Sequence, residues 1–222
     1  MAYDLVEFIK SILLVLTALI PILNPPGVAP IFLAYTQGSS ERERKAIAKR
    51  IAINGLFMLL GAMFVGTYLL KFFGISLEVV KVGGGLVVAT AGWRLLEAED
   101  HSMEQSQTTP AERNNLKRAF FPLTFPFTIG PGSISVAITL GVALRSRGGI
   151  DALNLAGGVI GIVLVCLTVY YCYRFANRLL DRLGETGITV FLRLSAFILL
   201  CIGVQIFWNG ASELLRGLIS GV

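Results

Sequence analysis

Residues 21–30 read Pro-Ile-Leu-Asn-Pro-Pro-Gly-Val-Ala-Pro and lie inside a run, residues 11–40, that contains no charged residue. Proline within a helix removes a backbone donor and clashes with the preceding turn, at a cost of about 3 kcal/mol or more. The residue before a proline is also steered away from helical geometry. A helix through this stretch must therefore break, and we predict the break at Asn24, Pro25, Pro26 and Gly27.

Four further runs lack charge, and each approaches the length of about 20 residues that a helix needs to cross a bilayer. They are residues 51–70, 119–144, 152–173 and 194–212. Of the 222 residues, 55% are hydrophobic and only 15% are charged, with a mean hydropathy of +0.73. Soluble domains carry about 25% charge, so this composition indicates a membrane protein. We predict spans at about residues 7–36, 45–70, 75–96, 119–144, 152–174 and 190–213.

The fourth span repeats the proline pattern of the first. Residues 126–135 read Pro-Phe-Thr-Ile-Gly-Pro-Gly-Ser-Ile-Ser, and both stretches carry Pro-x4-Pro-Gly at an offset of 105 residues. A weaker sequence similarity relates residues 80–84 of the third predicted span to residues 192–196 of the sixth. Because three spans per half is an odd number, a duplicated half must enter the membrane from the opposite side. We therefore predict an all-α membrane protein with six transmembrane helices in two inverted three-helix repeats, the first and fourth helices being discontinuous.

One membrane domain is predicted, with repeats at residues 1–97 and 119–222 and a cytoplasmic connector at residues 98–118. With the N-terminus placed outside, twelve Lys and Arg residues fall in the inner loops and six on the outer side. This bias follows the positive-inside rule, so we expect a multi-pass protein of the cell (inner or plasma) membrane with both termini extracytoplasmic. The net charge of +5 then reflects topology and contact with the lipid bilayer, and no nucleic-acid partner is expected.

The second break is predicted at Ile129 to Gly132. Broken backbone at mid-depth is tolerated only where it lines a cavity, so the two breaks are expected to meet near the membrane midplane. Half-helices are expected to begin near Val28 and Ser133, presenting free N–H groups and positive dipole ends that suit a small anionic or zwitterionic substrate. The predicted binding residues are Asn24, Pro25, Pro26, Gly27, Thr128, Gly130, Pro131, Gly132, Ser133 and Ser135.

Two amides inside apolar runs, Asn54 and Gln205, are weaker candidates for lining the cavity, with interhelical hydrogen bonding as the alternative. The unbroken spans place no ionisable catalytic group at mid-depth, so no enzyme, no metal site and no cofactor is expected. The cysteines Cys166, Cys172 and Cys201 are interpreted as small hydrophobes. The cluster Tyr170, Tyr171 and Tyr173 is interpreted as an anchor at the membrane interface.

Two stretches resemble the MarC family of integral membrane proteins. They are Asn24-Pro25-Pro26-Gly27-x-Ala29-Pro30-Ile31-Phe32-Leu33 and Pro126-x3-Gly130-Pro131-Gly132-x-Ile134-Ser135. The resemblance implies six helices and a transporter-like role, since some members are described as carriers of small neutral amino acids. It thus implies a secondary transporter that holds glycine or alanine at the two breaks and works by alternating access.

Several alternatives stay open at the level of sequence. A drug or antibiotic exporter, an exporter of another small anion, and a non-transporting structural or regulatory membrane protein all fit an apolar six-span chain. The coupling ion is equally open, because Na⁺ at unwound carbonyls, H⁺ through an interfacial acid such as Glu78, and uncoupled exchange all remain compatible with the residues. The direction of transport and the oligomeric state are not predicted.

Overall fold

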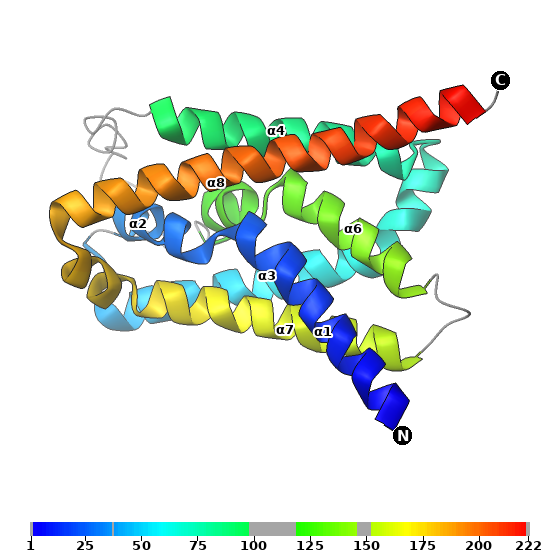
Figure 1. The fold of residues 1–222 in the computed structure, drawn as a ribbon. Coiled ribbons are helices and arrows are strands. Elements are labelled where there is room, and N and C mark those ends of the chain that lie inside the picture. Colours follow the sequence, from blue (N-terminus) through cyan, green and yellow to red (C-terminus); the bar gives the residue numbers. More distant parts are fainter. Residues whose placement is uncertain (1, 37, 98–118, 146–151, 221–222) are drawn as a thin grey trace.

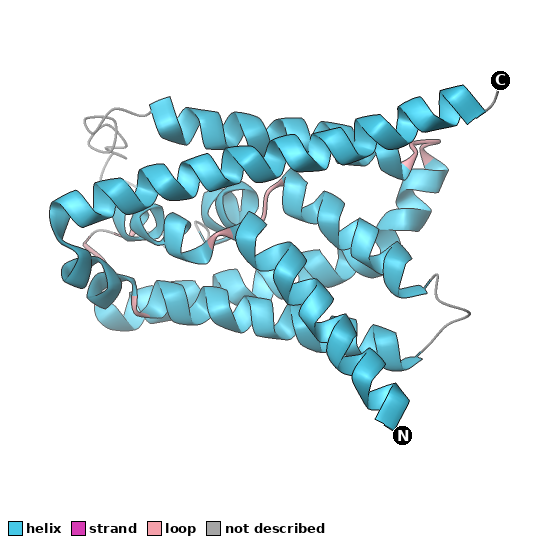
Figure 2. Ribbon diagram, in the orientation of Figure 1, coloured by secondary structure: helices cyan, strands magenta, loops and turns pink. Residues whose placement is uncertain are grey.

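The computed structural model describes residues 2–36, 38–97, 119–145 and 152–220, and every regular element in these ranges is a helix (Figures 1 and 2). The all-α class is therefore confirmed. The elements are α1 (Ala2–Leu23), α2 (Pro25–Tyr35), α3 (Glu41–Phe72), α4 (Leu77–Glu97), η1 (Ala119–Thr128), α6 (Pro131–Arg145), α7 (Ala152–Arg174) and α8 (Ala176–Ser220).

Four helical segments among the described residues are long and apolar enough to cross a bilayer. They are Asp4–Leu33, Glu41–Phe72, Ala152–Arg174 and Thr189–Gly217. A fifth is formed by η1 and α6 if this pair, bent by 70°, is one broken span. The predicted span at residues 75–96 is occupied by α4, a helix of 21 residues that does not belong to this set. Multi-pass membrane helices are thus established, while the count of six stays a prediction.

The long helices pack side by side and run mainly between two ends of the molecule (Figure 1). α4 lies along α8, α1 and α3 pack on α7, and α6 contacts α3, α4 and α7. α1 ends in the interior, where α2 continues it after a single non-helical residue. Hydrophobic side chains from α1, α3, α6 and α7 form the buried core, for example Val15, Leu59, Ala137 and Val165.

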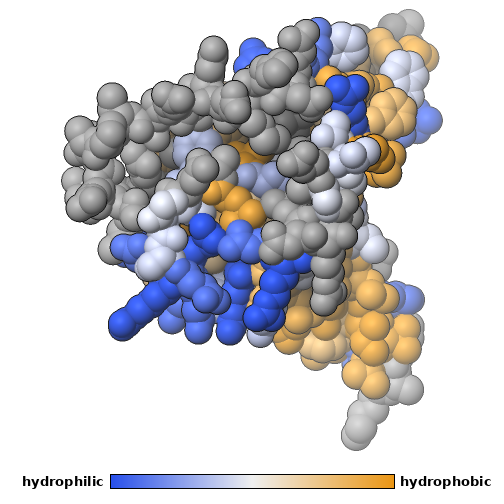
Figure 3. Space-filling view, turned by 90° about the vertical axis from the view of Figure 1, so that its left-hand side faces the viewer, coloured by the Kyte–Doolittle hydropathy of each residue, from blue (hydrophilic) through white to orange (hydrophobic). Residues whose placement is uncertain are grey.

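Both described termini lie at the same end of the molecule, on the right of Figure 1. The opposite end begins α3 and carries a concentration of hydrophilic side chains (Figure 3). Its basic residues in the first turns of α3 are exposed or half-buried, namely Arg42, Arg44, Lys45, Lys49 and Arg50. This arrangement is compatible with the predicted topology, whose orientation in the membrane stays a prediction.

Glycines allow α4 and α8 to approach each other closely. Gly85 faces the backbone of Phe207, and Gly203 faces the backbone of Ala89. A Cβ atom at Gly210 would lie 2.7 Å from the carbonyl oxygen of Glu78, so a side chain there would force the helices apart. Because small residues permit such backbone contact between membrane helices, α4 and α8 form a closely packed pair.

Candidate functional site

The first break consists of one residue, Asn24, which separates α1 from α2. Its backbone N–H donates to the carbonyl oxygen of Ile20 at 2.9 Å and ends α1. Its carbonyl oxygen accepts from the N–H of Val28 at 3.1 Å, and its side-chain Oδ1 accepts from the N–H of Gly27 at 3.3 Å. The φ angle of +41° is left-handed, a region that asparagine enters more readily than most other residues. Asn24 therefore both terminates α1 and caps α2.

The structure corrects the predicted extent of this break. Pro25, Pro26 and Gly27 form the first turn of α2, and the half-helix does not begin at Val28. Proline is favoured at the first helical position because its missing N–H has no helical partner to lose there. The expectation of free N–H groups at the start of this half-helix is also wrong. Pro25 and Pro26 have no N–H group, and the N–H groups of Gly27 and Val28 donate to Asn24.

The same prolines leave acceptors without helical partners at the end of α1. The carbonyl oxygens of Pro21 and Ile22 would receive N–H groups from the residues four positions later, which are Pro25 and Pro26. Neither proline can donate. The first break therefore has backbone acceptors without helical donors, while its own first N–H groups are absent or bonded to Asn24.

The second break lies at Ile129 and Gly130, between η1 and α6. In η1, Phe121 and Phe125 have extended backbone angles because each precedes a proline. The turn that ends η1 is wide, with the N–H of Ile129 donating to the carbonyl oxygen of Thr124 at 2.8 Å. α6 then begins at Pro131, two residues before the predicted start at Ser133, for the same reason as in α2.

Two backbone donors are left free at the start of α6. The N–H of Ile134 donates to the carbonyl oxygen of Gly130 at 3.2 Å, and the Ser133 hydroxyl donates to the same atom at 2.8 Å. Within the part of the chain that the structure describes, no acceptor meets the N–H groups of Gly132 and Ser133, although both residues are buried. A pair of unpaired donors at a helix N-terminus is a favourable place for negative charge.

α4 covers the start of α6. The hydroxyl of Ser135 donates to the carbonyl oxygen of Val80 at 3.2 Å, and Gly84 packs against the Ser135 side chain. Val88 packs so closely on Gly132 that a Cβ atom there would overlap its Cγ2 methyl. In this conformation the free donors of the second break are closed off by α4.

Tyr173 of α7 connects the two broken spans. Its ring stacks on Phe32 of α2, with centroids 4.7 Å apart and planes inclined by 12°. Its hydroxyl lies 2.8 Å from Oγ1 of Thr128, and because Thr128 donates to the carbonyl oxygen of Leu123, Tyr173 is the donor. Its exposed fraction is 1%, so its interpretation as an interfacial anchor was wrong. The signal for burial was its position on the face of α7 shared with Cys166 and Val169.

Comparison with known proteins identifies the family. The model of MarC family integral membrane proteins matches residues 9–215. The chain belongs to the MarC family. The MarC inner membrane protein of Salmonella typhimurium (strain LT2) is 29% identical over 220 residues, which cover 96% of this chain and 99% of that protein. A membrane protein of Methanocaldococcus jannaschii is 30% identical over 202 residues, covering 91% and 96%. No solved structure matches the chain.

These relatives are named as membrane or inner membrane proteins, and their names state neither a substrate nor a catalytic activity. Among the described residues of this MarC family member, no group of three or more His, Cys, Asp or Glu side chains is arranged to hold a metal ion. The site therefore has to be judged from its hydrogen-bonding groups alone.

The two weaker candidates lie in different places. Nδ2 of Asn54 is 3.4 Å from Oγ1 of Thr124, so this amide joins α3 to η1 one helical turn before Thr128. Gln205 is exposed on α8 and donates to Oδ1 of Asn209 on the same helix at 2.9 Å. The structure thus brings Asn54 to the broken span, whereas the hydrogen bond of the Gln205 side chain stays within α8.

Proposed function

We propose that this MarC family member is a secondary transporter for small neutral amino acids such as glycine and alanine. The observation that carries the proposal is the different chemistry of the two breaks. The start of α6 has free N–H groups at Gly132 and Ser133, which suit a carboxylate. The end of α1 has carbonyl oxygens without helical donors at Pro21 and Ile22, which suit an ammonium group. A zwitterion has one group for each break.

The packing around the donors favours a small substrate. Gly132 and Ser133 are buried, and Val88 of α4 already contacts Gly132. A large side chain on the substrate would need the same space as Val88. Glycine and alanine fit this limit, whereas drug-sized molecules need a larger apolar pocket.

The element contacts support the inverted repeat. The contact between α1 and α7 corresponds to the contact between η1 and α3. The contact between α2 and α7 corresponds to the contact between α6 and α3. The contact of α2 with α8 likewise corresponds to that of α6 with α4. Two inverted three-helix halves would produce such pairs, and alternating access would follow from one part moving against the other. We assign α4 and α8 to the moving part, because release at α6 requires α4 to leave Gly132.

The test is uptake of labelled glycine into proteoliposomes, with competitors that each lack one end of the zwitterion. Alanine is expected to compete, whereas acetate, which lacks the ammonium, and glycinamide, which lacks the carboxylate, are expected to compete at least tenfold less well. Gly132→Val is expected to abolish uptake, and membrane insertion and thermal unfolding of that variant show whether it is folded.

Competition by acetate as strong as that by alanine would favour a small-anion carrier, because the α6 donors alone would account for it. Inhibition by apolar drugs alone would favour a drug exporter. Absence of uptake and of amino-acid binding by the folded protein would contradict the proposal and favour a structural or regulatory role. Imposing Na⁺ and pH gradients separately identifies the coupling ion. For localisation we propose the inner membrane, as for the named relatives, with both termini outside the cytoplasm.

A further inference from the structure

α8 carries a line of polar side chains on the side that faces away from α4. Cys201, Gln205 and Asn209 follow one another at intervals of four residues, and all three are exposed. Gln205 lies two residues from Gly203, a rotation of about 200° around the helix axis. Since Gly203 contacts α4, the line lies on the opposite side. We call Cys201, Gln205 and Asn209 the α8 stripe.

The α8 stripe lies within a segment that is apolar enough to cross the membrane, Thr189–Gly217. Its exposed neighbours are large and hydrophobic, such as Phe197, Val204 and Trp208, which are 53–60% exposed. In the most apolar window of this segment only 12% is buried, against 17%, 22% and 44% in the other three spanning segments. Of the four spanning segments, the one in α8 is therefore the least covered by the rest of the protein. The two amides Gln205 and Asn209 lie in the middle of this segment.

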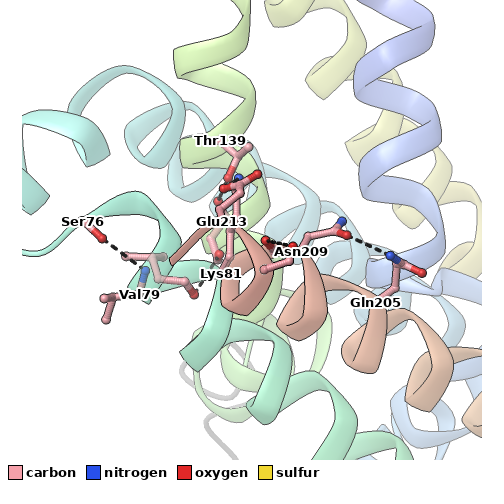
Figure 4. A network of polar contacts seen from close by, with 10 residues as sticks. Ser76, Val79, Lys81, Thr139, Gln205, Asn209 and Glu213 are labelled. Carbon is pink, nitrogen blue, oxygen red and sulfur yellow. Dashed lines mark hydrogen bonds and ion pairs between the residues drawn. The ribbon is translucent and has the colours of Figure 1, made fainter. Parts of the chain in front are cut away.

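The two amides satisfy each other only in part. Nε2 of Gln205 donates to Oδ1 of Asn209 at 2.9 Å, as the dashed line in Figure 4 shows. Oε1 of Gln205 and Nδ2 of Asn209 find no partner among the described residues. Farther along α8, Glu213 is paired with Lys81 of α4 at 2.6 Å, so the unpaired groups end there (Figure 4). Leaving an acceptor and a donor in hydrocarbon is unfavourable, and polar side chains in spans generally find partners.

We propose that the α8 stripe is the interface of a homodimer, in which it packs on the α8 stripe of a second copy. Two copies in one membrane share the same topology, so the two-fold axis relating them lies along the membrane normal and the two α8 helices run parallel. Every contact between a residue i of one copy and a residue j of the other then occurs twice, and the residues nearest the axis also meet their own counterparts. The free acceptor on Gln205 and the free donor on Asn209 are complementary, so two copies satisfy both groups reciprocally.

Hydrogen bonds between amides are an established source of association between membrane helices. A lipid tail can satisfy neither group, and an unrelated helix would need to supply a donor and an acceptor at the same spacing. The second copy supplies them necessarily. This inference stands independently of the proposed transport activity, since it uses no residue of either break.

The native cysteine in the stripe provides the first test. In a Cys166→Ala/Cys172→Ala background, the full-length protein is reconstituted in liposomes at high lipid excess and oxidised with copper phenanthroline. A disulfide-linked dimer through Cys201 is expected as the main product. The control carries Cys201→Ala and Phe57→Cys, which moves the thiol to an exposed position on α3, and it should yield at least tenfold less dimer.

The second test separates specific pairing from collision. Single-molecule photobleaching counts the subunits of fluorescently labelled protein over a range of protein densities in the membrane. Gln205→Leu/Asn209→Leu is expected to raise the density needed for half-dimerisation at least tenfold, whereas Val204→Leu, next to the stripe, leaves it within twofold. The double variant should insert normally because it only makes the span more apolar.

Monomers at every density, or a dimer that the double leucine variant leaves unchanged, would overturn the proposal. Cross-linking of Cys201 to a different protein in native membranes, without the homodimer, would overturn it as well.

Discussion

Gly132→Ala tests how tightly α4 closes over the second break. A Cβ atom on Gly132 would overlap the Cγ2 methyl of Val88 and lie 3.4 Å from the carbonyl oxygen of Gly84. Val88 is only 6% exposed, so its methyl has little room to move away. Extra atoms in a well-packed interior typically cost 1–3 kcal/mol, and we expect Gly132→Ala to lower the free energy of unfolding by about 2 kcal/mol.

Val88→Ala removes the opposing group and makes the prediction specific. Alone, it loses two buried methyl groups at about 0.8 kcal/mol each plus a small cavity term, or about 2 kcal/mol in total. In the double variant the new Cβ of residue 132 occupies space that Val88 has left. The combined loss should therefore be smaller than the sum of the single losses by about 1–2 kcal/mol, as expected for residues in direct contact.

Thermal unfolding in detergent measures these differences, at roughly 2–4 °C per kcal/mol for a chain of this size. Gly61→Ala is the matched control, because Gly61 lies in α3 with no atom within 4 Å of a Cβ added there. Alanine should raise the stability at that position by up to about 1 kcal/mol through its helix propensity. Additive losses in the double variant, or a Gly132→Ala variant as stable as the parent, would refute the inferred contact.

Three further tests concern Asn24, Tyr173 and the pair formed by Ser11 and Asn154. Asn24→Ala should lower the free energy of unfolding by about 2 kcal/mol, through a lost cap and a strained positive φ, and Asn24→Gly by only about 1 kcal/mol; denaturant titration of both checks this order. Tyr173→Phe should cost about 1 kcal/mol in thermal unfolding, since it removes the hydrogen bond to Thr128 and keeps the stacked ring; a larger loss would mean that the ring has moved. Ser11→Ala and Asn154→Ala, whose side chains lie 3.0 Å apart between α1 and α7, should show a coupling of about 0.6 kcal/mol in a double-mutant cycle; zero coupling would contradict the bond.

The position of each break could be predicted from the sequence, whereas the starts of the half-helices could not. Proline breaks a helix in its interior, and this effect alone locates the interruptions at Asn24 and at Ile129 correctly. The same residue is favourable in a first turn, so Pro25 and Pro131 begin helices instead of delaying them. Whether a proline ends a helix or begins one depends on whether the preceding residue caps the new helix. The side-chain amide of Asn24 supplies such a cap for α2.

Contacts between helices could not be predicted from the sequence, because periodicity shows which face is apolar and not which helix covers it. Tyr173 stands near the end of an apolar run, as interfacial tyrosines do, and only its hydrogen bond to Thr128 and its stacking on Phe32 distinguish it. In the same way, the sequence of α4 does not indicate that Val88 packs against Gly132 of α6. The sequence shows that Gln205 is an amide in an apolar run, but it does not show that this side chain is exposed on α8.

The two breaks are alike in sequence and differ in hydrogen-bonding chemistry, and two pairs of corresponding residues contribute to the difference. At the offset of 105 residues that relates the motifs, Ile129 stands where Asn24 stands in the first break. The side-chain oxygen of Asn24 accepts from the N–H of Gly27, whereas the side chain of Ile129 has no polar atom and packs toward Gly55 of α3. The N–H group of Gly132, which corresponds to Gly27, consequently stays free. The N–H group of Val28 bonds to the backbone carbonyl oxygen of Asn24, whereas among the described residues Ser133 makes no such bond to Ile129. The acceptors of the first break have a different origin, because Pro25, which cannot donate to the carbonyl oxygen of Pro21, stands where the second break has Gly130. Under the proposed function, these two differences give one break donors for a carboxylate and the other break acceptors for an ammonium group, as recognition of a zwitterion requires.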